Sequence, residues 1–183
     1  LRHTSNRSIT TLPLPDRPTR CSVSHETTTL PSGVRVVTET MDAVRSVSLG
    51  LWLSVGSRDE EPGQLGGSLF LEHTLFKGTS TRSASDIAET LDAVGGELNA
   101  FTSKELTCFH ARVLDTDLPV AFEVLANMLV DARNRPEDVD AERQVVLSEL
   151  DALNDAPDEL VHTEFCQLLL GEHPLAAETL GTL

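Results

Sequence analysis

The spacing of apolar and polar residues predicts that strands dominate the first half of the chain and helices the second. Apolar runs bounded by turn residues, alternating or continuous, are typical of strands. We expect such strands at residues 27–30, 34–39, 47–55, 97–103 and 106–114. The run 47–55 contains Trp52 and is strongly apolar, so we expect a central strand covered on both faces. The last two strands flank a turn at Lys104-Glu105 and form a hairpin.

Apolar residues three and four positions apart predict helices in the rest of the chain. We expect helices at residues 70–78, 83–94, 136–154 and 158–170, and one that opens at Asp115 or Asp117 with Val120, Val124, Leu125, Met128 and Leu129 on its apolar face. Ser83 or Ser85 is a favourable N-cap, and Pro136 suits a first helical turn. Early paired strands followed by helices indicate an α+β domain with a mostly antiparallel sheet.

Residues 1–24 differ from the rest in composition, because they are rich in Ser, Thr, Pro and Arg and hold one acidic residue, Asp16. Such a segment is typical of a disordered arm, and a transit peptide is the alternative. Residues 25–183 are long enough to bury one core, so we expect one domain there. Because the chain begins with Leu1 and stops at Leu183 just after a Gly-Thr, we expect a domain cut short at its C-terminus.

Charge and cysteine content exclude several classes of function. Residues 25–183 hold 10 basic and 28 acidic side chains, and such a body repels the phosphates of nucleic acids. No apolar run approaches the ~20 residues that a membrane-spanning helix requires. Cys21, Cys108 and Cys166 lie far apart without a Cys-x-x-Cys pair, which argues against disulfide scaffolds and cysteine zinc knuckles. Reduced thiols and an acidic body favour the cytoplasm.

The candidate chemistry begins with Glu72 and His73, which are adjacent in the short helix predicted at 70–78. A histidine at position 69 would complete the reversed zinc-peptidase motif His-x-x-Glu-His. In that motif two imidazoles hold the metal and the glutamate takes a proton from the bound water. Leu69 stands there instead. A Glu-His pair alone is more often a solvated surface pair.

A third metal ligand would have to come from another element. Glu142 and Glu149 are seven residues apart, which is two helical turns, so they share one face of the predicted helix 136–154. Paired glutamates on a helix are usually solvated, and spacing alone favours that alternative.

The stretch 70–79 (FLEHTLFKGT) resembles the active-site helix of the pitrilysin/insulinase family of zinc metallopeptidases, and specifically its mitochondrial processing peptidase-like branch. Further stretches resemble the N-terminal domain of that family in the same order: Gly56–Glu60, Asp92–Thr102, Glu142–Glu149, and His173–Leu175 with Leu180–Thr182. The resemblance covers residues 27–182. It implies the fold of that metallopeptidase domain.

The resemblance also implies roles for individual residues. Glu72 is expected to be the general base and His73 a zinc ligand. Glu149, 76 positions after His73, is expected to be the carboxylate ligand of a single zinc ion. Glu142 is expected to orient the site through the ligands.

The same resemblance places Asn99 and Ala100 on an edge strand that binds the substrate as an added β-strand. That mode grips the peptide backbone and tolerates varied side chains. The alternative for Asn99 is a strand residue near a turn that binds no ligand.

Leu69 departs from the family pattern, which has the first histidine at this position. Leucine has no lone pair, and zinc sites keep at least three protein ligands, of which His73 and Glu149 remain. Loss of a residue that only orients a ligand weakens metal binding ~10–100-fold, and loss of a ligand should weaken it more. We therefore expect little zinc on this chain. His110, on the predicted strand 106–114, is a possible substitute, although the family has no ligand there.

Two functions follow from these observations. The first is the N-terminal domain of a zinc metalloendopeptidase that hydrolyses peptides or unfolded proteins, inactive or weak here because of Leu69. Its chamber would be closed by a second domain or subunit of the same family. The second is a non-catalytic family member that acts as a substrate-binding or scaffold subunit of an active partner. Leu69 favours the second function, and retention of Glu72, His73, Glu142 and Glu149 argues against it.

Overall fold

The computed structural model describes residues 24–181. The chain divides into two compact units, residues 1–44 and residues 45–183, and each unit is described by itself. The predicted disordered arm at 1–24 lies outside the described residues except for Ser24, which is the first residue of a strand. No helix within the described range is long and apolar enough to cross a membrane.

The first unit contains a two-stranded antiparallel sheet of β1 (Ser24–Thr29) and β2 (Arg35–Thr40). The strands are joined by a turn in which Gly33 adopts a φ of +89°. Glycine has no Cβ and enters this left-handed region without steric cost, so the Pro-Ser-Gly sequence forms the turn. The structure thus confirms the two predicted strands, with shifts of a few residues at their ends.

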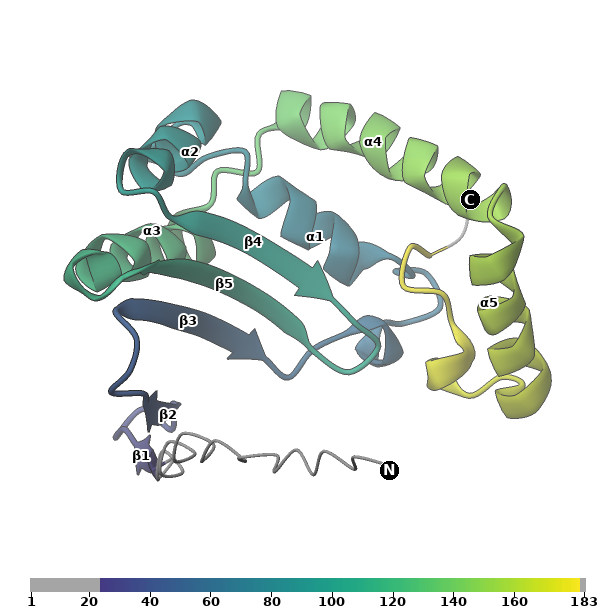
Figure 1. Cartoon of the computed structure of the whole chain (residues 1–183). Coiled ribbons are helices and arrows are strands. Elements are labelled where there is room, and N and C mark those ends of the chain that lie inside the picture. The colour runs from purple at the N-terminus through teal and green to yellow at the C-terminus, as the bar shows by residue number, and fades with distance from the viewer. Residues whose placement is uncertain (1–23, 182–183) are drawn as a thin grey trace, which may run out of the picture. The chain divides into compact units, whose positions relative to one another are not determined.

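The second unit is built on a three-stranded antiparallel sheet in the order β3-β5-β4, formed by β3 (Ser46–Leu53), β5 (Thr107–Leu114) and β4 (Glu97–Thr102) (Figure 1). The prediction that residues 47–55 form the central strand is wrong. β5 is central, while β3 lies at one edge and Trp52 is 63% exposed. The apolar run misled because apolar content does not determine the order of strands in a sheet; the Trp52 ring packs edge-on against Phe101, with centroids 5.9 Å apart.

Five helices follow the predicted pattern: α1 (Gly67–Leu75), α2 (Ala84–Ala93), α3 (Leu118–Asp131), α4 (Pro136–Asn154) and α5 (Pro157–Leu170). Short 3-10 turns are η1 (Ser57–Asp59), η2 (Asp115–Asp117) and η3 (Pro174–Ala176). Ser83 caps α2 by accepting from Asp86 N–H, while the Asp86 carboxylate accepts from Ser83 N–H. Helix α1 ends at Leu75, earlier than predicted, and Phe76 is its C-cap.

The core lies between one face of this sheet and helices α1, α2 and α3. It contains Leu75, Ile87, Leu91, Phe109, Ala111, Val113, Ala121, Val124, Leu125 and Met128. Successive side chains of a strand point to opposite faces, so Phe109, Ala111 and Val113 of β5 all point into this core. Phe76, just after α1, packs against Phe109 with ring centroids 6.3 Å apart. The core therefore holds α1 against the sheet.

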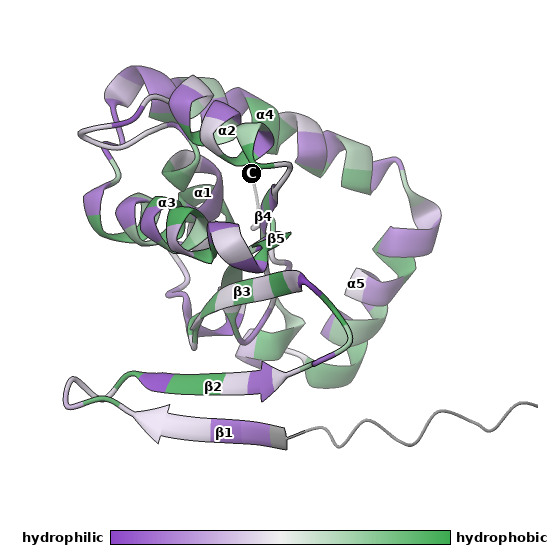
Figure 2. Cartoon of the chain, turned by 60° about the vertical axis from the view of Figure 1, so that its left-hand side comes forward, coloured by the Kyte–Doolittle hydropathy of each residue, from purple (hydrophilic) through white to green (hydrophobic). Residues whose placement is uncertain are grey.

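Helices α4 and α5 lie outside this core, as Figure 1 shows. Helix α4 contacts α1, and it buries only Glu142 and Leu150. Hydrophobic and hydrophilic segments alternate along α5 in Figure 2, and Phe165 and Leu168 of that helix are exposed. Helix α4 therefore contacts α1 and α5, and α5 also contacts η3.

The start of α1 packs backbone to backbone against the last described residues. Gly66, the N-cap of α1, has a φ of +88°, and a Cβ built there would lie 2.6 Å from the carbonyl oxygen of Leu180. A Cβ on Gly181 would lie 2.4 Å from the carbonyl oxygen of Leu65. No side chain fits at either place, so residues far apart in sequence fix the position from which α1 begins.

Replacement of Gly66 by alanine is therefore expected to lower the free energy of unfolding by about 2 kcal/mol or more, because it combines an unfavourable φ with a backbone clash. Gly63 is the matched control, since a Cβ there meets nothing within 4 Å. Gly63→Ala should change stability by less than about 1 kcal/mol. Urea denaturation followed by circular dichroism measures both, and equal effects would contradict the proposed packing.

Candidate metal centre

Helix α1 presents two chemically different faces to its surroundings. Leu75 packs into the core, whereas Glu72 is buried at 9% exposure and His73 is partly buried.

The helix is short, and the carboxylate of Glu60 supports its N-terminus by accepting hydrogen bonds from Gly66 N–H and Ser68 N–H at 2.7 and 2.6 Å. Helix N-termini have unsatisfied N–H groups and a positive dipole end, so a carboxylate is stabilising there.

Glu72 is held by the edge strand β4. The hydroxyl of Thr102, the last residue of β4, donates to Glu72 Oε2. Thr102 also lies within hydrogen-bond distance of Thr107 across the hairpin. The motif of α1 alone does not indicate this contact, because Thr102 follows Glu72 by 30 residues. The candidate general base is thus attached to the strand proposed to bind substrate.

His73 is held from its Nδ1 side by Glu142 of α4. Glu142 is only 4% exposed, and its Oε2 lies 3.1 Å from His73 Nδ1. Its other oxygen forms an ion pair with Lys77 Nζ. A carboxylate at Nδ1 favours the tautomer with a proton there, which leaves the lone pair on Nε2. Glu142 is therefore not a solvated helix glutamate, and Lys77 is a neighbour that sequence spacing did not reveal.

The free side of the imidazole faces the second glutamate of α4. His73 Nε2 lies 3.7 Å from Glu149 Oε2, and the Glu149 side chain is 45% exposed. Helices α1 and α4 thereby bring an imidazole nitrogen and an open carboxylate to one point, from residues 76 positions apart. Glu142 and Glu149 sit two turns apart on one face of α4 and contact opposite sides of the same ring.

Leu69 lies one turn before His73 on α1, so the two side chains share one side of the helix. A hydrocarbon side chain supplies no ligand there. Across residues 24–181, no group of three or more His, Cys, Asp or Glu is placed to hold a metal ion. The donors at this point are one imidazole and one carboxylate, which do not make up the three protein ligands of a zinc site.

His110 does not supply the missing ligand. It follows Phe109 in β5, and alternate strand residues point to opposite faces. Phe109 points into the core beneath α1, so His110 lies on the other face, where its ring is 6.2 Å from that of Phe101.

Asn99 and Ala100 lie in β4, which pairs with β5 on one side and is an edge of the three-stranded sheet. The Asn99 side-chain oxygen accepts a hydrogen bond of 2.8 Å from Ala100 N–H. This contact occupies a backbone donor that an incoming strand would otherwise bind. Whether the two residues bind substrate stays a prediction.

The buried position of Glu142 leads to a stability prediction with a close control. Glu142→Gln removes the charge that Lys77 and His73 both contact, and is expected to lower the free energy of unfolding by about 1–3 kcal/mol. Glu149→Gln makes the same change at a side chain that is 45% exposed, and should cost less than about 1 kcal/mol. Chemical denaturation of both variants checks the order, and an equal or reversed order would refute it.

Comparison with known proteins places this geometry in context. The chain matches the insulinase family, peptidase family M16, over residues 35–183. It is 52% identical over 156 residues to an uncharacterized zinc protease of Streptomyces coelicolor, covering 85% of this chain and 34% of that protein. It is 36% identical over 154 residues to a probable mitochondrial-processing peptidase subunit beta of Arabidopsis thaliana, covering 84% of this chain and 29% of that one.

A solved structure agrees with these sequence matches. The crystal structure of a protease from Helicobacter pylori superposes with a TM-score of 0.82 at 26% identity, covering 87% of this chain and 39% of that chain. The chain spans about a third of the length of the curated relatives it matches. The α+β fold and the resemblance inferred from sequence are thereby confirmed, and the chain belongs to the insulinase family of peptidases, family M16.

Proposed function

We propose that the chain is the N-terminal domain of a zinc metalloendopeptidase of the insulinase or processing-peptidase type in which Leu69 impairs zinc binding. The observation that carries this proposal is the convergence of His73 Nε2 and Glu149 Oε2, 3.7 Å apart, beside a position that holds leucine. Two ligands remain where three are needed, so metal occupancy and peptide hydrolysis by this chain are expected to be low.

The remaining residues keep the arrangement that such a site needs. In the proposal, Glu142 holds the imidazole of His73 in one orientation and tautomer, and Lys77 balances the charge of Glu142. Glu72, held by Thr102, is the proposed general base. Glu149 is the proposed carboxylate ligand, and its exposure leaves it free to move toward a cation.

The proposed substrate is a peptide or an unfolded protein that adds to the edge of β4. Main-chain hydrogen bonds supply the affinity in this mode, so the sequence of the peptide matters little. In this proposal Asn99 releases Ala100 N–H when the substrate strand arrives, since the two are bonded to each other here.

A second domain or subunit of the same family is proposed to close the chamber, because the chain covers about a third of its relatives. One relative carries the name of a processing-peptidase subunit beta, which supports an arrangement with a partner. We further propose a cytoplasmic location, for which the widely spaced cysteines and the acidic composition are the support.

The alternative function is a non-catalytic subunit that binds substrate or acts as a scaffold for an active partner. Leu69 specifically favours this alternative, because it removes a ligand while the fold stays intact. The two proposals predict different results for a variant that carries histidine at position 69.

Leu69→His is the test, made in the chain together with the second domain or subunit proposed above. The variant is expected to bind one zinc ion at least about 100-fold more tightly than the parent, since a ligand is added to two that already converge. Leu71→His is the matched control, because Leu71 lies on the same helix, is 50% exposed and is two positions from His73. Calorimetric zinc titration and hydrolysis of a quenched fluorescent peptide are the measurements.

The outcomes separate the proposals. Stoichiometric tight zinc binding by the parent would show that our interpretation of position 69 is wrong. Zinc binding and hydrolysis by Leu69→His alone support the impaired peptidase. Zinc binding without hydrolysis by that variant favours the non-catalytic subunit.

A further inference from the structure

Helix α5 turns an apolar stripe outward. Val161, Phe165 and Leu168 follow one another at intervals of four and three residues, and Leu169 lies beside Leu168. At 3.6 residues per turn these side chains lie along one side of the helix. These four residues form what we call the α5 seam, and their exposed fractions run from 57% to 86%. A contiguous exposed apolar patch of this kind marks a surface for another molecule.

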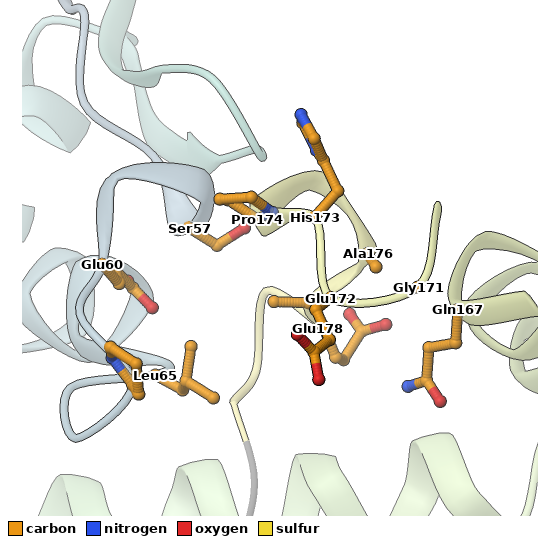
Figure 3. Close-up of a pocket in the computed structure, with 12 residues that line it drawn as sticks. Ser57, Glu60, Leu65, Gln167, Gly171, Glu172, His173, Pro174, Ala176 and Glu178 are labelled. Carbon is orange, nitrogen blue, oxygen red and sulfur yellow. The ribbon is translucent and has the colours of Figure 1, made fainter. Parts of the chain in front are cut away.

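The opposite side of α5 attaches the helix to the rest of its unit. Leu160, Thr163 and Cys166, at intervals of three residues, are the partly buried residues of α5. The Thr163 hydroxyl donates to the carboxylate of Glu178. Gln167 lines a cavity between α5 and the segment that contains η3, and no residue of the α5 seam is in that lining (Figure 3). The helix is therefore held by one side, and the α5 seam faces away from that side.

The charge around the α5 seam disfavours two possible occupants. Residues 144–183 hold eight acidic side chains and neither Lys nor Arg. Helices that lie on membrane surfaces carry Lys or Arg on their polar face, so α5 is a poor membrane anchor. Asp158 and Glu172 lie near the two ends of the seam. Two copies of this chain paired along the seam, in either direction, would bring these acids together, and such like-charge contacts are unfavourable.

The same features indicate what kind of occupant fits. Intervals of four and three residues match the 3.5-residue repeat with which two helices pack along a shared apolar seam. Glu164 lies beside Phe165 and Leu168, at a position that flanks such a seam and pairs with a charge on the facing helix. The complementary surface is thus an amphipathic helix with apolar residues along its centre and Lys or Arg along its flanks.

We propose that the α5 seam binds a helix of this kind that belongs to the second domain or subunit of the same family. The existence of that second domain or subunit rests on the proposed function, since this chain covers 34% of a relative such as the Streptomyces coelicolor zinc protease. Helices α4 and α5 contact each other and are joined by residues 155–156. A partner bound to α5 therefore lies beside the helix that carries Glu149.

Calorimetric titration of the purified chain with a three-heptad peptide tests the chemistry of the occupant. The peptide carries Leu at the a and d positions and Lys at e and g, where the lysines also keep it from pairing with itself. It is expected to bind at least about tenfold more tightly than the same peptide with Glu at e and g, because opposite charges face each other only in the first case. Added salt should narrow this difference.

Leu168→Glu is expected to weaken binding of the Lys peptide about tenfold or more, because it places a charge in the apolar contact. Val130→Glu is the matched control, since Val130 of α3 is 83% exposed and Leu168 is 86% exposed. The control should leave the affinity unchanged. Both variants should unfold at the temperature of the parent, since neither side chain is buried. Equal affinities of the two variants, or of the Lys and Glu peptides, would overturn the proposal.

The source of the helix is tested by maleimide labelling of Leu168→Cys and Val130→Cys, with the labelled position identified by mass spectrometry. The second domain or subunit is expected to slow labelling at position 168 at least about tenfold and to leave position 130 unchanged, because a docked helix excludes the reagent. An unchanged rate at position 168 would overturn the proposal. These rates require neither zinc nor hydrolysis, so failure of the Leu69→His test leaves them interpretable.

Sedimentation velocity and vesicle flotation examine the two disfavoured occupants. The parent chain is expected to stay monomeric and to remain unbound by vesicles that contain phosphatidylserine. Dimerisation that Leu168→Glu abolishes would assign the α5 seam to a second copy, and vesicle binding that the same variant abolishes would assign it to a membrane. Either result would overturn the proposal.

Discussion

The buried carboxylate of Glu142 is the interaction on which the arrangement of this site depends. Helix α4 is mostly polar and buries only Glu142 and Leu150, so apolar packing contributes little to its position. Glu142 instead joins α4 to α1 through Lys77 and His73. A buried charge is costly unless it is paired, and this one has partners on both oxygens. The same contact that holds the helices together also orients the imidazole.

This coupling explains why the site keeps its geometry although Leu69 is not a histidine. Leu69 is partly buried on α1. The positions of His73 and Glu149 are set by Glu142 and the core beneath α1, neither of which involves a bound metal. The proposed loss of a ligand at position 69 is therefore compatible with an intact fold.

Most secondary structure of this chain was predictable because its signals are local. Ser83 with Asp86, Pro136, and the glycines after α2 and α5 mark helix ends through capping and backbone geometry. The strand order was not predictable in the same way. An apolar run carries no information on which strands pair, and β3, with Trp52 63% exposed, pairs only with β5 in this sheet, so it was wrongly expected at the centre.

The amino-acid sequence by itself determined the helices, the hairpin, the family and the candidate residues Glu72, His73, Glu142 and Glu149, since these depend on local propensity and on a recognisable spacing. Only the tertiary structure decided that β5 is central, that Thr102 holds Glu72, that Lys77 pairs with Glu142, and that the α5 seam is exposed. Each of these depends on how segments distant in sequence pack against one another.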